Sequence, residues 1–176
     1  MIMIKMRHWS GALPAKIMTM ASIRNAKPGE GAGLSALCVR SKAHWGYDAA
    51  FMRKCAAALL VSEAEIAAGR VLVACDATGR TIGVAGVAPE GETADLDVLF
   101  VDPPAIGSGA GRALFDAAAA LARRFGARRL TILADPNAAV FYERMGAHFV
   151  RNAPSDAIPG RTLPLYEYDL TSETVS

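Results

Sequence analysis

A glycine-rich stretch at residues 107–112 has the residue types and the spacing of an anion-binding turn. Gly107, Gly109 and Gly111 alternate there with Ser108 and Ala110, and Arg112 follows. Glycine permits positive φ angles and a close approach of the backbone to a ligand. A helical pattern of apolar residues begins at the same place, and free amides at a helix N-terminus lie at the positive end of its dipole. The stretch predicts a pyrophosphate site with Arg112 as a fixed cation; the alternative is a turn that only packs a helix against a strand.

The spacing of these glycines argues against two common nucleotide-binding turns. The pattern is G-x-G-x-G, whereas the dinucleotide-binding Rossmann turn has G-x-G-x-x-G. A P-loop would continue into Gly-Lys-Ser or Gly-Lys-Thr, and this sequence does not. The stretch therefore matches neither site.

The composition is that of a globular chain. It has 176 residues, 52% of them hydrophobic, which is enough for one domain with a sizeable core. A net charge of +2 argues against an electrostatic nucleic-acid binder, and no apolar run is long enough for a membrane span. Three widely spaced cysteines form no metal-ligand pattern with the three histidines. We therefore expect no metal, reduced thiols and a cytoplasmic location.

The order of the predicted elements indicates an α+β fold with α/β/α layers. Residues 1–20 lack the clean apolar core of a secretory signal and are expected to be a loose extension, followed by one domain at 21–170 and a tail at 171–176. A first strand followed by a Pro-Gly turn is expected within 21–30, and further strands at 70–76, 81–89, 92–101, 128–134, 147–152 and 162–170. Helices are expected at 33–47, at 49–60 after Asp48, from Ser62 to Gly69, at 109–125, and from Asp135 to Gly146. This order predicts a mixed sheet flanked by helices.

The strand predicted at 92–101 carries two carboxylates next to the glycine-rich stretch. Its alternation places Leu96, Val98 and Phe100 on one face and Asp95, Asp97, Leu99 and Val101 on the other. Two carboxylates on one face would raise the pKa of one of them. The alternative is a pair of solvated aspartates.

Two segments resemble the signatures of one enzyme family. The segment "LFVDPPAIGSGAGRALF" resembles the acetyl-CoA signature of the GCN5-related N-acetyltransferase (GNAT) superfamily, in which a strand ending in Val-x-Pro leads to Arg/Gln-x-x-Gly-x-Gly/Ala and a helix. The segment "NAAVFYERMGAHFV" resembles the second signature, an Asn and then a Phe-Tyr pair before Met-Gly and a strand. The resemblance covers about residues 21–170. One departure is Ile106, which stands at the Arg/Gln position and is expected to be a packing variant of the turn.

The resemblance implies a twisted, mostly antiparallel sheet and acetyl-CoA as the cosubstrate. Pantetheine would pair with the main chain near Leu99 to Val101, where the strand splays from its neighbour and leaves a cleft. The cofactor-binding residues would be Leu99, Phe100, Val101, Ile106, Gly107, Ser108, Gly109, Ala110, Gly111, Arg112, Asn137 and Tyr142. An amine in the cleft would attack the thioester directly.

The same resemblance assigns roles in proton transfer. Tyr142 would protonate the leaving thiolate, because a phenol has a pKa close enough to that of a thiol; the alternative is a core tyrosine. Asp95 would be the base that takes the amine's proton, and the alternative is a water chain. Asn137 would bond the amides of CoA or, in the other interpretation, stabilise a helix end.

The acceptor side of the predicted cleft carries the weaker signals. Trp45 and Tyr47, with His44 between two predicted helices, would line it, and Asp97 would contact the substrate. The loop at 153–164 would cover it, with Arg161 either a carboxylate partner or a plain surface arginine. The sequence thus predicts an N-acetyltransferase for the primary amine of a small molecule, with a homodimer as a further expectation. The alternatives are a CoA-binding module without turnover and an enzyme that acetylates proteins or peptides.

Overall fold

The structure is a computed structural model that describes residues 21–171, so the extension predicted at 1–20 and residues 172–176 of the tail lie outside it. Its elements in chain order are β1 (Ser22–Asn25), α1 (Gly31–Ala43), α2 (Ala49–Cys55), the 3-10 turn η1 (Ala57–Leu59), α3 (Glu63–Ala67), β2 (Val71–Cys75), β3 (Thr81–Glu90), β4 (Thr93–Val101), η2 (Pro103–Ala105), α4 (Ala110–Arg124), β5 (Arg129–Leu133), η3 (Pro136–Ala138), α5 (Ala139–Arg144), β6 (His148–Pro154) and β7 (Thr162–Asp169).

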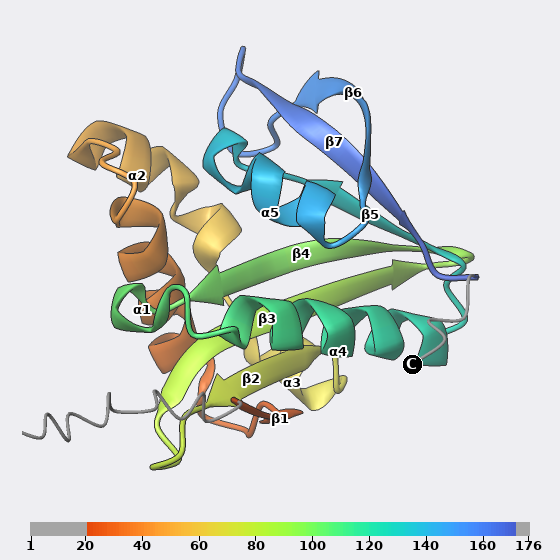
Figure 1. The fold of residues 1–176 in the computed structure, drawn as a ribbon. Coiled ribbons are helices and arrows are strands. Elements are labelled where there is room, and N and C mark those ends of the chain that lie inside the picture. The colour runs from red at the N-terminus through yellow and green to blue at the C-terminus, as the bar shows by residue number, and fades with distance from the viewer. Residues whose placement is uncertain (1–20, 172–176) are drawn as a thin grey trace, which may run out of the picture.

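All seven strands of the described chain form one sheet in the order β1-β2-β3-β4-β5-β7-β6. Every neighbouring pair is antiparallel except β4 and β5, which are parallel. A parallel pair needs a crossover connection, and here α4 supplies it. The predicted α+β fold with a mixed, mostly antiparallel sheet is confirmed (Figure 1).

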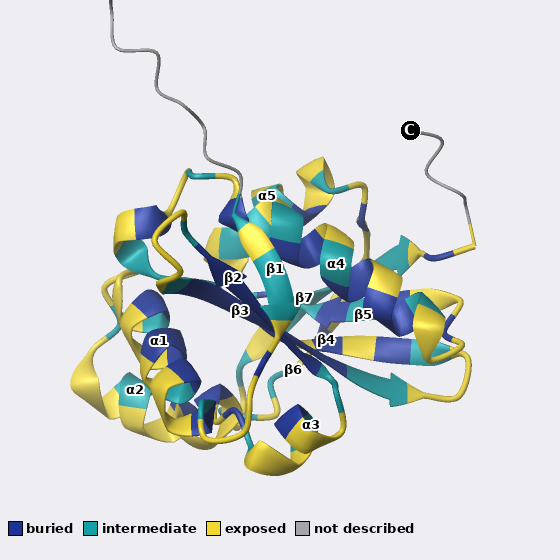
Figure 2. Cartoon of the chain, turned by 90° about the horizontal axis from the view of Figure 1, so that it is seen from below, coloured by how far each residue is buried: buried dark blue, intermediate teal, exposed yellow. Residues whose placement is uncertain are grey.

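Helices cover both faces of the sheet, and each face has its own core. On one face α1, α2 and α3 pack on β2 and β3 through Leu34, Leu37, Cys55 and Ile66. On the other face α4 buries the apolar stripe Leu114, Phe115, Ala118 and Leu121, and the same cluster includes Tyr142 of α5. Figure 2 shows α1 and α4 on opposite sides of the buried central strands. These are the α/β/α layers that the element order predicts.

Side-chain caps set several helix starts where the sequence indicates them. The Asp48 carboxylate accepts the Phe51 N–H at 2.8 Å, and the Ser62 hydroxyl accepts the Glu65 N–H at 3.1 Å. Two predicted helices are shorter than expected. The one at 49–60 ends at Cys55 and continues as η1, and the one after Asp135 begins with η3, because Asp135 caps the tight turn at the Asn137 N–H.

A β-bulge interrupts β4 at Asp97. Val87 of β3 pairs with Leu96 and Gly86 pairs with Val98, so Asp97 is an extra residue with no partner in β3. The strict alternation predicted for this strand is therefore wrong, because Leu96 joins the core under α4 while Val98 joins the core under α1. Gly86 fits this irregularity, since a Cβ there would lie 2.9 Å from the Val98 Cγ2 atom.

Candidate active site

A cleft opens where β4 and β5 separate. The two strands pair only from Thr93 to Asp95 and from Arg129 to Thr131, and beyond that β5 continues with β7 alone. The bulge at Asp97 follows directly, as expected of a feature that bends a strand and ends its pairing. Figure 1 shows β5 and β7 turning away from β4 towards the side where α1 and α2 lie. The cleft has a volume of about 850 Å³ and is lined from α1, β4, the glycine-rich turn, β5, α5 and the β6–β7 loop.

One wall of the cleft is an unpaired strand edge. Leu99, Phe100 and Val101 pair with β3 on one side. On the other side no strand of the described chain pairs with them, and all three line the cleft. The backbone of this edge can accept an extended ligand as an added strand.

The glycine-rich turn presents free backbone amides to the same cleft. Gly107 and Gly109 have φ angles of 83° and 91°, which only glycine adopts readily, and α4 begins directly after them. The amides of Gly107, Gly109, Gly111 and Arg112 have no hydrogen-bond acceptor within residues 21–171. These four residues line the cleft, so the turn can bind an anion.

Three other residues of the turn, Ile106, Ser108 and Ala110, have surroundings that differ from those of these four. Ser108 and Ala110 do not line the cleft; the Ser108 hydroxyl accepts the Ala110 N–H at 3.3 Å, and the Ala110 side chain is buried. Ile106 lines the cleft but is 46% exposed, so its side chain is not the packing variant expected from the sequence.

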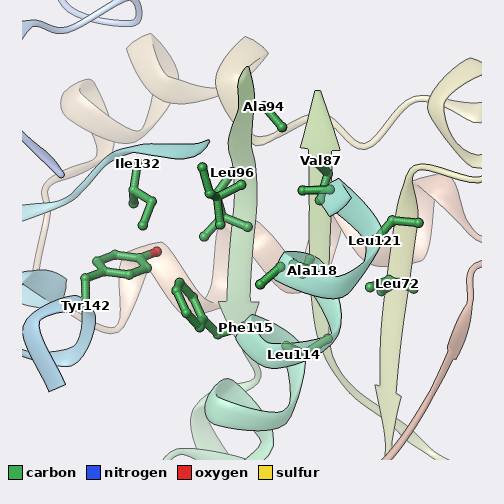
Figure 3. Packing of buried hydrophobic residues seen from close by; sticks show 14 of the residues in the cluster. Leu72, Val87, Ala94, Leu96, Leu114, Phe115, Ala118, Leu121, Ile132 and Tyr142 are labelled. Atoms are coloured by element: carbon green, nitrogen blue, oxygen red, sulfur yellow. The ribbon is translucent and has the colours of Figure 1, made fainter. Parts of the chain in front are cut away.

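Tyr142 offers a hydroxyl with no protein partner. Its ring is buried among Phe115, Phe141 and Tyr166. Its hydroxyl makes no hydrogen bond within the described chain, and Figure 3 shows it pointing from α5 past Ile132 towards β4. Burial raises the pKa of this phenol well above its usual value, and the charge of Asp135 adds to the effect. Tyr142 thus keeps its proton at neutral pH and lines the cleft.

The two aspartates of β4 have different surroundings. Asp95 lies where β4 and β5 still pair, and its carboxylate accepts a hydrogen bond from the Thr131 hydroxyl. It is not among the described residues that line the cleft, whereas Asp97 is. Desolvation raises the pKa of Asp97, and the charges of Glu65 and Asp95 raise it further. The geometry therefore favours Asp97 over Asp95 as the carboxylate that meets a ligand.

Of the two aromatic residues predicted to bind the acceptor, one lines the cleft and the other does not. Trp45 is half-exposed and lines the cleft, next to His44. Tyr47 does not line it, because its ring stacks on Phe51 with centroids 4.1 Å apart. The Tyr47 hydroxyl donates to Asp135 at 2.8 Å.

The side chain of Asn137 is engaged with the protein in this structure. Its amide nitrogen donates to Asp135 at 2.9 Å and to the Tyr47 hydroxyl at 3.2 Å. Asn137 still lines the cleft, so its contact with CoA amides stays a prediction.

Sequence reasoning missed a charged cluster on the acceptor side. The Lys42 ammonium lies 2.5 Å from Asp135, which in turn accepts from Tyr47, and an Arg161 Nη atom donates to the Tyr47 hydroxyl at 3.2 Å. Lys42, Asp135 and Arg161 all line the cleft. Lys42 and Asp135 are 93 positions apart in the chain, so no local motif could have indicated their contact.

Two kinds of feature are absent from the described part of the chain. Within residues 21–171, no three His, Cys, Asp or Glu side chains lie close enough together to hold a metal ion. None of the helices there is both long enough and apolar enough to cross a membrane.

Comparisons with known proteins agree with this geometry. Residues 33–156 match a family model described as an acetyltransferase (GNAT) domain. Comparison with curated proteins gave no match. Among solved structures, a GCN5-related N-acetyltransferase from Rhodopseudomonas palustris is 26% identical with a TM-score of 0.69, and the match covers 87% of this chain and 98% of that one.

Two further structures, at lower identity, share the fold. The PaiA N-acetyltransferase from Thermoplasma acidophilum, in complex with coenzyme A, is 16% identical with a TM-score of 0.69, over 85% of this chain and 99% of that one. YncA from Salmonella typhimurium, with acetyl-CoA, is 21% identical with a TM-score of 0.62, over 89% and 98%. Because the family model spans well over half of the sequence, this chain belongs to the GNAT family of acetyltransferases.

Proposed function

We propose that this protein transfers the acetyl group of acetyl-CoA directly to the primary amine of a small molecule. One observation carries the proposal: a free strand edge, a row of unpaired amides and an unpartnered phenol line a single cleft. These are the groups needed to bind an extended thioester with a pyrophosphate and to protonate its leaving thiolate.

The described residues fit acetyl-CoA at both ends of the cleft. The amides of Gly107, Gly109, Gly111 and Arg112 would bind the pyrophosphate, and the β4 edge from Leu99 to Val101 would pair with pantetheine. The glycines there leave room for the approach, since a Cβ at Gly107 or Gly109 would meet no protein atom within 4 Å. The solved structures from Thermoplasma and Salmonella, which share the fold, contain CoA and acetyl-CoA.

The chain's own residues supply the proton chemistry. When bound, acetyl-CoA supplies an electrophilic thioester carbonyl. Tyr142 holds its proton at neutral pH and would donate it to the departing sulfur. Asp97, whose pKa is raised, would accept the proton that the amine loses, and Asp95 or a water chain is the alternative route predicted from the sequence.

The shape of the cleft supports a small acceptor over a protein or peptide. The β6–β7 loop contributes Ser155, Asp156, Ala157 and Arg161 to the lining and so walls the side opposite β4. Trp45 adds to this wall from the turn after α1. The cytoplasmic location and the homodimer stay predictions.

A screen for thiol release tests the proposal. The protein is incubated with acetyl-CoA and a pooled library of primary amines, and free CoA thiol is followed together with acetyl-CoA binding by calorimetry. We expect both binding and amine-dependent release. Binding without release under any amine would favour a CoA-binding module, and release with peptides alone would favour a peptide acetyltransferase.

A further inference from the structure

The cleft wall opposite β4 carries an unequal number of positive and negative charges. We call Lys42, Asp135 and Arg161 the Lys42–Arg161 cluster. The Lys42 ammonium lies 2.5 Å from the Asp135 carboxylate, and an Arg161 Nη atom lies 3.9 Å from it. The three side chains are only 13%, 15% and 21% exposed. The cluster therefore holds two cations and one anion in a partly desolvated place.

Asp135 is the only carboxylate that pairs with either cation within residues 21–171. Burial alone would raise the pKa of Asp135, but hydrogen bonds from Lys42, from the Asn137 backbone and from Tyr47 lower it overall. It is thus ionised at neutral pH and balances one of the two positive charges. Asp156 also lines the cleft but forms no ion pair with Arg161 in the described chain. One positive charge is left over.

Arg161 lines the cleft and keeps side-chain donors that have no partner within residues 21–171. One Nη atom donates to the Tyr47 hydroxyl, while the other Nη atom and Nε make no hydrogen bond within the described residues. The guanidinium lies 4.8 Å from the Phe51 ring centroid and 5.5 Å from that of Tyr47, so the stacked pair of rings stabilises its position. A guanidinium with two nitrogen donors free of protein partners can bind a carboxylate through both of its oxygens.

Backbone hydrogen bonds close the loop that carries Arg161 without using its side chain. The backbone closes the loop through the Ser155 N–H to the Arg161 carbonyl at 2.8 Å and the Arg161 N–H to the Ile158 carbonyl at 3.1 Å. Arg161 shares its one carboxylate partner, Asp135, with Lys42, and a partly buried cation whose charge is not fully balanced costs free energy. The unbalanced charge is better explained by a ligand that brings the missing anion.

We propose that the acceptor amine also carries a carboxylate, which Arg161 and Lys42 bind while the amine faces Asp97. This inference rests on the proposed acetyltransferase function and names its substrate class, an amino acid or a similar aminocarboxylate. Positive charge on the wall formed by α1 and the β6–β7 loop and negative charge at the β4 bulge match the two ends of such a zwitterion. The pyrophosphate of CoA has its own anion site at the amides of the glycine-rich turn.

Matched acceptors test the substrate class. Each of the common L-amino acids is assayed for thiol release from acetyl-CoA beside its amide and its decarboxylated amine, which keep the side chain and lose the carboxylate. We expect at least one amino acid to exceed both analogues in kcat/KM by roughly ten- to a hundredfold, as for a hydrogen-bonded charge pair. Equal or better turnover of the amides and amines would overturn the inference and leave the acetyltransferase function standing.

Two variants assign the effect to the cluster. Arg161→Gln keeps a planar, hydrogen-bonding side chain but removes the charge, and we expect it to raise KM for the amino acid and erase its advantage over the amide. Arg151→Gln, which removes an exposed arginine from β6 outside the cleft, should change neither the KM for the amino acid nor its advantage over the amide. If Arg161→Gln instead weakens acetyl-CoA binding in calorimetry and spares the carboxylate preference, the cluster serves the cosubstrate and the inference is wrong.

A binding measurement keeps the test independent of turnover. With CoA present, the preferred amino acid should raise the Tm of the wild-type protein and of Arg151→Gln, but not that of Arg161→Gln. Should no amine release thiol while the amino acid still stabilises the protein through Arg161, the carboxylate site would stand and the acetyltransferase proposal would fall. If no amine releases thiol and the amino acid does not stabilise the protein through Arg161, both the acetyltransferase proposal and the carboxylate site are wrong.

Discussion

The donor side of the cleft and its acceptor side are built from different kinds of groups. The donor side, residues 99–112, offers mainly backbone: the free edge of β4 and four unpaired amides. The proposed acceptor side, formed by Trp45 and the Lys42–Arg161 cluster, offers side chains from α1 and the turn after it, from Asp135 at the N-cap of η3, and from the β6–β7 loop. Backbone binding depends on the local fold and tolerates changes of side chain, whereas we expect single substitutions on the proposed acceptor side to change its specificity. One fold can therefore keep one donor and accept different amines.

The largest effect is expected where the two sides meet, at Tyr142. Replacing it by Phe removes one hydroxyl that has no protein partner, so the fold and acetyl-CoA affinity should be unchanged. Loss of a positioned acid should lower kcat on the order of 10²-fold or more. Steady-state kinetics and calorimetry on the same preparation separate the two quantities. An unchanged kcat would mean that Tyr142 is a core residue and takes no part in the reaction.

A second prediction tests whether the donor side is a backbone site. Gly109→Val puts a branched side chain where the pyrophosphate would approach, and it should weaken acetyl-CoA binding by about tenfold or more. The φ angle of 91° adds strain of about 1–3 kcal/mol to the folded state.

Gly79→Val is the matched control for that strain. Gly79 has a φ of 83° in the β2–β3 turn, away from the cleft, and a Cβ there would also meet nothing within 4 Å. Both variants should lose similar stability in denaturant unfolding, and only Gly109→Val should lose affinity in calorimetry. Equal affinity in the two would mean that the anion site lies elsewhere.

The difference between the two sides also explains what the sequence could predict. The sequence predicts the seven strands and the caps at Asp48 and Ser62, and the structure confirms them. The residues proposed for the donor side are contiguous, so the sequence can indicate them through their spacing and turn chemistry. It does not predict the bulge at Asp97, because the bulge depends on how β3 and β4 pair, although Gly86 within a strand is a hint.

The acceptor side could not be read because its contacts are long-range. The Tyr47 hydroxyl meets Arg161 across 114 positions, and Lys42 meets Asp135 across 93. The sequence leaves Arg161 as either a carboxylate partner or a surface arginine, and only the fold places it on the Tyr47–Phe51 pair. Pairings of this kind are set by tertiary packing and leave no local pattern.

A third prediction concerns the carboxylate between the two sides. Asp97→Asn should lower turnover by about tenfold at neutral pH and recover as pH approaches the pKa of the free amine, if Asp97 is the base. Asp95→Asn is the matched variant. Asp95 lies two residues earlier on the same strand and accepts a hydrogen bond from Thr131, so its replacement should lower turnover less. A larger loss of turnover in Asp95→Asn than in Asp97→Asn would mean that Asp95 is the base. A loss that is uniform with pH and confined to the acceptor's KM would mean that the carboxylate only binds the amine.

The raised pKa of Asp97 also predicts the sign of a stability change. A carboxyl whose pKa is higher in the folded than in the unfolded state favours folding most when protonated, and this contribution is lost as pH rises through the folded pKa. At neutral pH the ionised group is therefore unfavourable to folding. Because Asp97 is exposed and solvent screens its charge, Asp97→Asn should unfold at only slightly higher denaturant concentration than the wild type. The difference should disappear in acid. A variant that is less stable at neutral pH would contradict this electrostatic interpretation.

The smallest effect is expected from Ile106, where this chain departs from the family signature. Ile106→Arg would add a flexible cation at the cleft, beside the unpaired amides that we propose bind the pyrophosphate through the backbone. Because the side chain is 46% exposed, the added charge would be well solvated and screened, so we expect acetyl-CoA affinity to rise only a few-fold. Calorimetry at two salt concentrations checks this, since the gain should shrink as salt rises. Ile106→Gln, which has length but no charge, is the control. A gain of a hundredfold or more would show that side-chain charge dominates the donor side, and the contrast with the acceptor side would fail.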